Sequence, residues 1–223
     1  MPQIEISVPE SALGPIGRAE KHHPLKITLL QGNLLAERVD AIVNPANESL
    51  LGGGGLDGMI HSAAGSQLLD ECETLNGCET GNAKITKGYR LPATNVIHAV
   101  GPIYPDPPSD KYSKHYDEYS IASPARKQEI EELYQRDVER ARDLLLQVHK
   151  NILRVAQENK LKRISIPAIS TGIFGYPAED ASIVAHQAVF EYLRDNGEGS
   201  LDEIRFVLYE TEKYKLYEKA FSS

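Results

Sequence analysis

The sequence has few of the features that mark secreted, membrane-bound or metal-binding proteins. Its 223 residues include only two cysteines, Cys72 and Cys78, whose separation fits neither a disulfide framework nor zinc-ligand spacing. No apolar run approaches the roughly 20 residues of a membrane-spanning helix. The first residues lack the basic and apolar regions of a secretory signal. We therefore expect an intracellular protein, in the cytoplasm or nucleus, with no membrane partner.

Clusters of basic residues are also missing. The formal net charge is −8, from 24 Lys and Arg against 32 Asp and Glu. Proteins that bind long nucleic acids usually present a basic face, so we expect no such partner. A local anion site is still compatible with this charge, because backbone amides bind phosphate without a net positive charge.

Strand-like and helix-like segments alternate from Lys26 onward, which predicts one α/β layered domain over residues 25–223. Residues 1–24 form an extension, in which the alternation of Ile4, Ile6 and Val8 allows a short edge strand. The Pro-, Tyr- and Ser-rich stretch 102–124 predicts a surface loop. The expected strands are 26–32, 40–44, 83–86, 95–100, 163–169 and 203–209; the expected helices are 56–75 with an interruption at Gly65, a long one from about Ile130 to Asn159, 178–196 and 211–221.

Four consecutive glycines, Gly52 to Gly55, follow the strand 40–44 and precede a helix. They match a dinucleotide fingerprint poorly, since the first glycine should lie at the strand end, and no Gly-Lys-Ser/Thr follows as in a Walker loop. Glycine lets a ligand approach the backbone, and the first amides of a helix favour an anion. The loop therefore predicts a phosphate site, with a flexible loop tip as the alternative.

A second strand–loop–helix junction, SIPAISTGIFGYP at 165–177, offers further amides and the hydroxyls of Ser170 and Thr171. Carboxyl ends of parallel strands share one sheet edge, so two amide-rich loops there suit a diphosphate. Phe174 and Tyr176 either pack against a ribose or cover the core.

Several dispersed stretches resemble the macrodomain family, MacroD type, over roughly residues 26–220. They are VDAIVNPAN (39–47), LGGGGLDGMIHSAAG (51–65), TGNAKITKGYRLP (80–92), VIHAVGP (96–102) and PAISTGIFGYP (167–177), with 103–128 standing out as an insertion. The resemblance implies a three-layer α/β/α sandwich with a central mixed β-sheet, which binds ADP-ribose at its carboxyl edge.

The resemblance also implies an activity. It is metal-independent, cofactor-free hydrolysis of the ester between mono-ADP-ribose and Asp or Glu side chains of modified proteins. O-acetyl-ADP-ribose is the related small substrate. We expect the protein to act as a monomer. Two alternatives stay open: a non-catalytic reader of ADP-ribosylated proteins, and a phosphatase of a phosphorylated ADP-ribose metabolite.

The resemblance assigns roles to individual residues. Asp57 orients or activates the attacking water, and Asn47 bonds the distal ribose. The adenine end would meet the Leu34 backbone, with Tyr209 near the base. The other residues expected to contact the ligand are Asn33, Ala46, Gly54, Gly55, Leu56, Ser170, Thr171, Gly172, Ile173 and Phe174.

Two positions depart from the family pattern. Asn33 stands where the family usually has an aspartate that accepts a hydrogen bond from the adenine amino group. Neutral hydrogen bonds are weaker than charged ones, so we expect weaker adenine discrimination. Pro45 replaces the usual alanine, and either stiffens the turn or removes one amide contact.

Histidine adds no second catalytic group in this interpretation. His61 lies one helical turn beyond Asp57 and is expected to be a structural hydrogen-bonding group under the glycine loop, with a relay to Asp57 as the alternative. His98, in an apolar strand, is expected to be a core histidine with satisfied hydrogen bonds. The other five histidines show no metal-ligand spacing; they are His22, His23, His115, His149 and His186. The insertion 103–128 either shapes target choice or is a passive loop.

Overall fold

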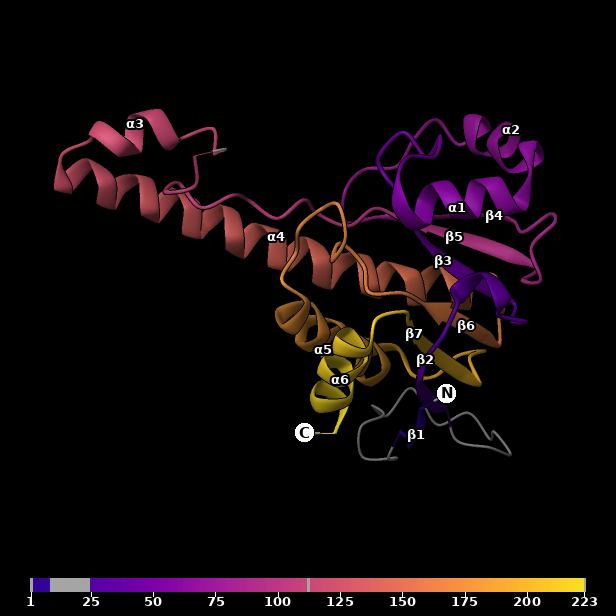
Figure 1. Cartoon of the computed structure of the whole chain (residues 1–223). Coiled ribbons are helices and arrows are strands. Elements are labelled where there is room, and N and C mark those ends of the chain that lie inside the picture. Colours follow the sequence, from indigo (N-terminus) through magenta and orange to yellow (C-terminus); the bar gives the residue numbers. More distant parts are fainter. Residues whose placement is uncertain (1, 9–24, 112, 223) are drawn as a thin grey trace.

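A seven-stranded mixed sheet forms the centre of the structure, a computed structural model that describes residues 2–8, 25–111 and 113–222 (Figure 1). The strand order is β1-β2-β7-β6-β3-β5-β4. The edge strands β1 and β4 run antiparallel to their neighbours, and all other pairs are parallel. The strands are β1 (Gln3–Ser7), β2 (Lys26–Gln31), β3 (Ala41–Pro45), β4 (Ala83–Lys87), β5 (Asn95–Ala99), β6 (Arg163–Ile166) and β7 (Glu203–Leu208).

Helices cover both faces of this sheet, so the predicted three-layer sandwich is confirmed. On one face, α1 (Gly55–Ala64) and α2 (Ser66–Thr74) bury Ile60 and Leu68 against the sheet. These helices are separated at Gly65, whose φ of 88° ends α1, as the sequence predicts.

The opposite face carries the larger core. It is covered by α4 (Pro124–Glu158), α5 (Ala178–Asn196) and α6 (Thr211–Phe221). A cap starts α4, since the Ser123 hydroxyl accepts from the Arg126 amide and Pro124 fits the first turn. No helix among the described residues is long and apolar enough to cross a membrane.

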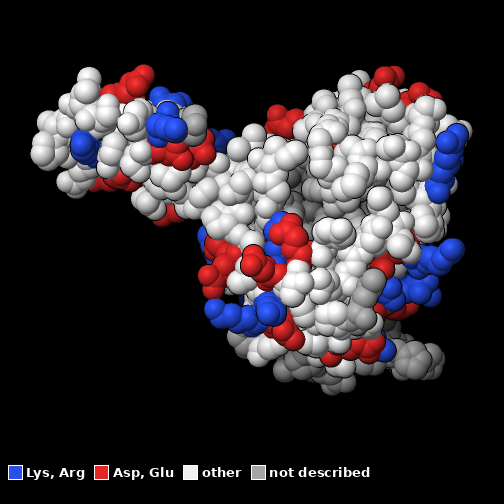
Figure 2. All heavy atoms as spheres, in the orientation of Figure 1, with Lys and Arg blue, Asp and Glu red and all other residues white. Residues whose placement is uncertain are grey.

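The prediction of a loop over 102–124 is wrong at its end, where α3 (Tyr116–Ile121) forms. The first turns of α4 extend away from the sheet, and α3 packs beside them (Figure 1). Basic and acidic side chains intermingle on this projecting segment (Figure 2). An ion pair joins its two helices, since Arg126 on α4 lies 2.6 Å from Glu118 on α3. The composition of this stretch, rich in Pro, Tyr and Ser, did not predict a helix or its pairing with α4.

Two smaller outcomes concern strand limits. The predicted edge strand near Ile4 is confirmed as β1, while residues 9–24 of the expected extension lie outside the described residues. The strand predicted over 163–169 ends at Ile166, because Pro167 cannot donate a ladder hydrogen bond. The chain after Ile166 is thereby released to form the second loop.

Candidate functional site

The carboxyl ends of the central parallel strands surround one cavity of about 770 Å³. Its walls come from the segments that follow β2, β3, β6 and β7. The volume lies in the range of a site for a nucleotide-sized ligand. Both loops that the sequence singled out line this cavity, so they face the same side of the molecule.

The glycine loop turns directly into α1, and glycine is favoured at Gly55 by its backbone and at Gly54 by a close neighbour. Gly55 has a φ of 60°, which side chains rarely adopt. A methyl group on Gly54 would lie 2.9 Å from Cδ1 of Ile173, which reaches over from the second loop. The two loops therefore touch across the cavity, and a bulkier residue at 54 would displace Ile173.

The start of α1 leaves amides free to bind a ligand. Gly54 is its N-cap and supplies no side-chain hydrogen bond. The amides of a first helical turn have no intrahelical acceptor and lie at the positive end of the helix dipole. Because Gly54, Gly55, Leu56 and Asp57 all line the cavity, this end of α1 favours an anionic group there.

The second loop is held in an unusual conformation. Ser170 adopts a φ of 63°, and its buried hydroxyl has no hydrogen-bond partner among the described residues. The Ser170 carbonyl accepts from the Tyr176 amide at 3.0 Å, while the Thr171 hydroxyl donates to the Ala168 carbonyl at 3.0 Å. Strained backbone and unpaired polar atoms cluster at functional sites, because a ligand can satisfy them.

Asp57 is the buried carboxylate of the site, only 5% exposed. Its Oδ1 atom accepts a hydrogen bond of 2.7 Å from Nδ2 of Asn44. Nε2 of His61 lies 3.6 Å from the same oxygen, beyond a good hydrogen bond. His61 lies under the glycine loop, where a methyl group on Gly52 would be 3.4 Å from its ring. Its Nε2 atom is buried without a hydrogen-bond partner among the described residues, so the structure does not show the hydrogen bond expected of it there.

A group of possible metal ligands lies behind Asp57. Ligand atoms of His61, Cys72 and His98 are all within 4.8 Å of one another. Burial lowers the pKa of His98 to about 3, with the nearby His61 adding to the shift, and burial raises the pKa of the Cys72 thiol to about 11. These are zinc-ligand residue types, although sequence spacing gave no sign of them.

Two asparagines of the cavity wall, Asn33 and Asn47, already hold their own loops. Oδ1 of Asn33 accepts from the Leu35 amide at 3.0 Å and caps the short 3₁₀ helix Leu34–Ala36. Asn47 donates from Nδ2 to the Gly52 carbonyl at 2.9 Å, and its Oδ1 accepts from Ser49. Both asparagines therefore present preorganised groups to the cavity.

Most residues expected to contact the ligand line the cavity wall. Ala46 does not, and neither does Tyr176, whose role the sequence left open. Ala46 is buried, and its amide donates to the Ala99 carbonyl at 3.0 Å. Tyr176 packs edge-on against Tyr104 and donates to Asp180, so it belongs to the core. Those in the wall are Asn33, Leu34, Asn47, Gly54, Gly55, Leu56, Asp57, Ser170, Thr171, Gly172, Ile173, Phe174 and Tyr209.

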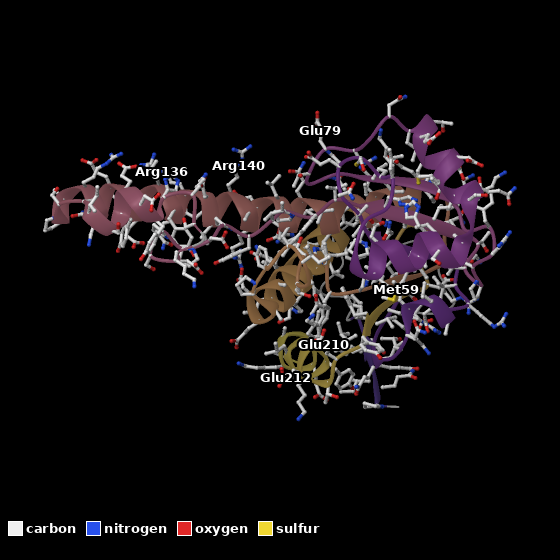
Figure 3. The ribbon with its side chains drawn as sticks, turned by 45° about the horizontal axis from the view of Figure 1, so that its top comes forward. Met59, Glu79, Arg136, Arg140, Glu210 and Glu212 are labelled. Atoms are coloured by element: carbon white, nitrogen blue, oxygen red, sulfur yellow. The ribbon has the colours of Figure 1, made fainter. Side chains whose placement is uncertain are left out.

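Sequence reasoning missed several residues of the site. Met59 on α1 and Glu210 before α6, both labelled in Figure 3, border the cavity. Pro45, which the sequence had singled out, lines it at the end of β3. Asn44 is more important, because it contacts Asp57 directly and is fully buried. A polar side chain in the apolar strand AIVN was a visible signal, since buried polar groups need partners.

Comparisons with known proteins agree with this geometry. The family model described as Macro domain matches residues 43–133 and 132–185. The macro domain-containing protein CT2219 of Chlorobaculum tepidum is 40% identical over 197 residues, which cover 88% of this chain and 96% of that protein. ADP-ribose glycohydrolase MACROD1 of Rattus norvegicus is 42% identical over 194 residues, which cover 84% of this chain and 64% of that protein. The structure of the Trypanosoma brucei macrodomain in complex with ADP-ribose gives a TM-score of 0.67 at 36% identity, covering 86% of this chain and 68% of that one.

Proposed function

Because this chain belongs to the macrodomain family, we propose that its cavity binds ADP-ribose and that it hydrolyses the ester joining ADP-ribose to acidic side chains. The observation that carries the proposal is the meeting of two amide-rich loops and one buried carboxylate, Asp57, in a single cavity. The name of the rat relative, an ADP-ribose glycohydrolase, supports a hydrolase. The T. brucei complex supports ADP-ribose as the ligand.

The ligand would lie along the sheet edge. Amides at Gly54–Leu56 and in the loop from Ser170 to Phe174 would hold the diphosphate. The adenine would lie near Asn33, Leu34 and Tyr209, and the distal ribose near Asn47. This order places the sugar carbon that carries the ester beside Asp57, which is the arrangement that hydrolysis needs.

Asp57 would act on water in one of two ways. As a general base, its carboxylate takes a proton from the water that attacks the ester. As an orienting group, it only holds the water, and a phosphate oxygen of the ligand takes the proton. In both cases the products are free ADP-ribose and an unmodified Asp or Glu side chain. O-acetyl-ADP-ribose offers the same ester without the protein.

The setting we propose is intracellular, in the cytoplasm or nucleus, with the protein acting as a monomer on mono-ADP-ribosylated proteins. Cys72 and Cys78 are both free and buried, which suits a reducing compartment. The net charge of −8 would disfavour long nucleic acids as competitors for the site.

Release of ADP-ribose from a glutamate-linked modified protein is the direct test. We expect turnover by the wild-type protein, and loss of turnover in Asp57→Ala while calorimetry still detects ADP-ribose binding. Asp70→Ala, on the exposed side of α2, is the matched control and should behave as wild type. If the wild-type protein holds the modified substrate without releasing ADP-ribose, the chain is a reader. If only a phosphorylated ADP-ribose is cleaved, it is a phosphatase.

A further inference from the structure

A line of buried polar side chains runs from Asp57 into the core, across three neighbouring strands and α1. Asn44 on β3 and His98 on β5 lie directly opposite each other in the sheet register. Nδ2 of Asn44 is 2.7 Å from Oδ1 of Asp57 and 3.1 Å from Nδ1 of His98. Nε2 of His98 is 2.9 Å from the hydroxyl of Thr86 on β4. Asn44 and His98 are fully buried, and Thr86 is 3% exposed.

The direction of each hydrogen bond follows from the carboxylate. An ionised Asp57 only accepts, so the amide atom of Asn44 that faces it is the NH₂ group. The other hydrogen of that group points at Nδ1 of His98, which must accept. A neutral imidazole with an acceptor Nδ1 carries its hydrogen on Nε2. Nε2–H then donates to Thr86, whose hydroxyl donates to the Lys87 carbonyl at 3.2 Å.

This arrangement leaves Nε2 of His98 unavailable as a metal ligand. It carries a hydrogen and already has an acceptor in Thr86, while the thiol of Cys72 lies 3.6 Å away. The low pKa of His98 keeps the ring neutral at ordinary pH, so the tautomer is set by its two neighbours. The cluster of His61, Cys72 and His98 is therefore better explained as packing around a hydrogen-bond line.

We propose that His98 and Thr86 are positioning residues that act through Asn44 to hold the carboxylate of Asp57, with Oδ1 occupied and Oδ2 turned toward the ligand cavity. The surroundings of Gly53 show where the second carboxylate oxygen of Asp57, Oδ2, points. A methyl group there would lie 3.1 Å from Oδ2 of Asp57 and 3.1 Å from Nδ2 of Asn47. Because Gly53, Asn47 and Asp57 all line the cavity, Oδ2 faces the expected sugar.

The orientation of the Asn44 amide depends on the tautomer of His98, because the NH₂ group faces both Asp57 and His98 while Oδ1 of Asn44 is buried without a hydrogen-bond partner among the described residues. If His98 carried its hydrogen on Nδ1, that hydrogen would face the NH₂ group of Asn44, and the amide would have to turn over. Its oxygen would then meet Oδ1 of Asp57 at 2.7 Å, two acceptors without a hydrogen between them. The carboxylate would rotate away, and Oδ2 would leave the cavity. The titratable groups around Asp57 are His61 on α1, Cys72 on α2 and His98 behind Asn44.

Thr86 offers a conservative way to test the line. Thr86→Val keeps the shape but removes the hydroxyl that accepts from Nε2–H, so only Asn44 and the weaker sulfur acceptor of Cys72 then hold His98 in that tautomer. Thr86→Ser keeps the hydroxyl. Since this inference rests on the proposed function, turnover and ADP-ribose affinity are measured separately. We expect kcat to fall about tenfold or more in Thr86→Val, with ADP-ribose affinity unchanged and Thr86→Ser close to wild type.

Thr28→Val is the matched control for loss of a buried strand hydroxyl. Thr28 on β2 is fully buried and donates to Glu203 at 2.7 Å, away from the cavity. It should lower stability without changing kcat. Equal kcat values in Thr86→Val and Thr86→Ser would overturn the proposal, as would a fall in Thr28→Val as large as that in Thr86→Val.

NMR of nitrogen and carbon nuclei in the wild-type protein and the Thr86 variants tests the tautomer of His98 without any substrate. We expect His98 to show a hydrogen on Nε2 and none on Nδ1, and the Asn44 side-chain amide and the Asp57 carboxyl carbon to shift in Thr86→Val but not in Thr86→Ser. A hydrogen on Nδ1 would overturn the proposal. If the wild-type protein releases no ADP-ribose but these signals appear, the proposed hydrolase function fails while the positioning line stands.

Discussion

The two sides of the cavity differ in chemistry: one is lined by main-chain amides, and the other by buried side chains. The wall toward the expected diphosphate is made of main-chain amides and glycines in two loops, with Ile173 as the side chain that links them. The wall toward the expected ester is made of buried side chains, with Asp57 held by Asn44 and, behind it, His98. We therefore expect binding to be spread over many small contacts, and the proposed chemistry to depend on one line of side chains. Substitutions should affect the two functions separately.

The largest effect is expected from Asn44→Asp on the side-chain wall. This substitution removes the NH₂ group that donates to both Asp57 and His98. It places a second carboxylate about where the NH₂ group lay, 2.7 Å from Oδ1 of Asp57. A buried charge without a partner is expected to cost about 3–5 kcal/mol of the free energy of unfolding. Urea unfolding measures the loss, with the exposed Asn76→Asp as control. A loss below about 1 kcal/mol would mean that the side-chain line is not needed by the fold.

Acid should lower the stability of the fold more than it affects ligand binding at the amide wall, through two buried histidines: His98 behind Asp57, and His149 on α4, outside the cavity. Burial lowers the pKa of His98 to about 3 and that of His149 to about 4, so both stay neutral when folded and protonate on unfolding near their usual value of 6.5. The unfolded chain then binds more protons, and stability falls as the pH drops below 6.5. At pH 5 the expected loss is about 2 kcal/mol for each histidine.

Urea unfolding at pH 7 and pH 5 tests this, with ADP-ribose affinity measured on the folded protein at both values. Main-chain amides do not titrate, so the affinity should change far less than the stability. Stability that rises toward pH 5 would contradict the buried, neutral state of these histidines.

Ser170→Ala probes the amide wall. The Ser170 hydroxyl is buried without a partner, so its removal should leave the thermal midpoint unchanged or raise it. If the hydroxyl instead donates to the ligand, ADP-ribose affinity should fall by about 1.5 kcal/mol, roughly tenfold. Calorimetry and thermal unfolding on one preparation separate the two effects. A lowered midpoint with unchanged affinity would show that Ser170 serves the fold alone.

Asn33→Asp tests the base end of the same wall. The Oδ1 atom of Asn33 already caps the Leu35 amide, so an aspartate can keep that bond and accept a charged hydrogen bond from adenine. We expect ADP-ribose to bind about 1 kcal/mol more tightly, roughly fivefold, and a hypoxanthine analogue to gain nothing. Equal gains for both bases would remove Asn33 from base recognition.

The smallest effect is expected on the projecting segment of α3 and α4. Ile121 is 88% exposed at the end of α3, and Arg136 and Arg140 on α4 point away from the body (Figure 3). Ile121→Asn should change the free energy of unfolding by less than about 0.5 kcal/mol. It should also leave ADP-ribose affinity unchanged. An altered affinity would show that the segment communicates with the cavity.

The sequence predicted the amide wall of the cavity better than the side-chain wall. The two loops were predictable, because glycines, hydroxyls and helix starts are local signals. Asp57 was singled out only through the resemblance to the macrodomain family, since a carboxylate in the first turn of a helix is common. Asn44, His98 and Thr86 were not predictable as a line, because it depends on the register of β3, β4 and β5 and on a tautomer. Ala46 was placed among the ligand contacts, yet its amide continues the pairing of β3 with β5.

Both loops are proposed to bind the diphosphate of one ADP-ribose molecule together. A titration of the amide NMR signals with ADP-ribose tests this most directly. The account predicts that the amides of Gly54–Asp57 and those of Ser170–Phe174 shift with the same dissociation constant, while the amides of α3 do not move. If only one loop responded, or the two loops responded with different constants, the shared diphosphate site would be contradicted.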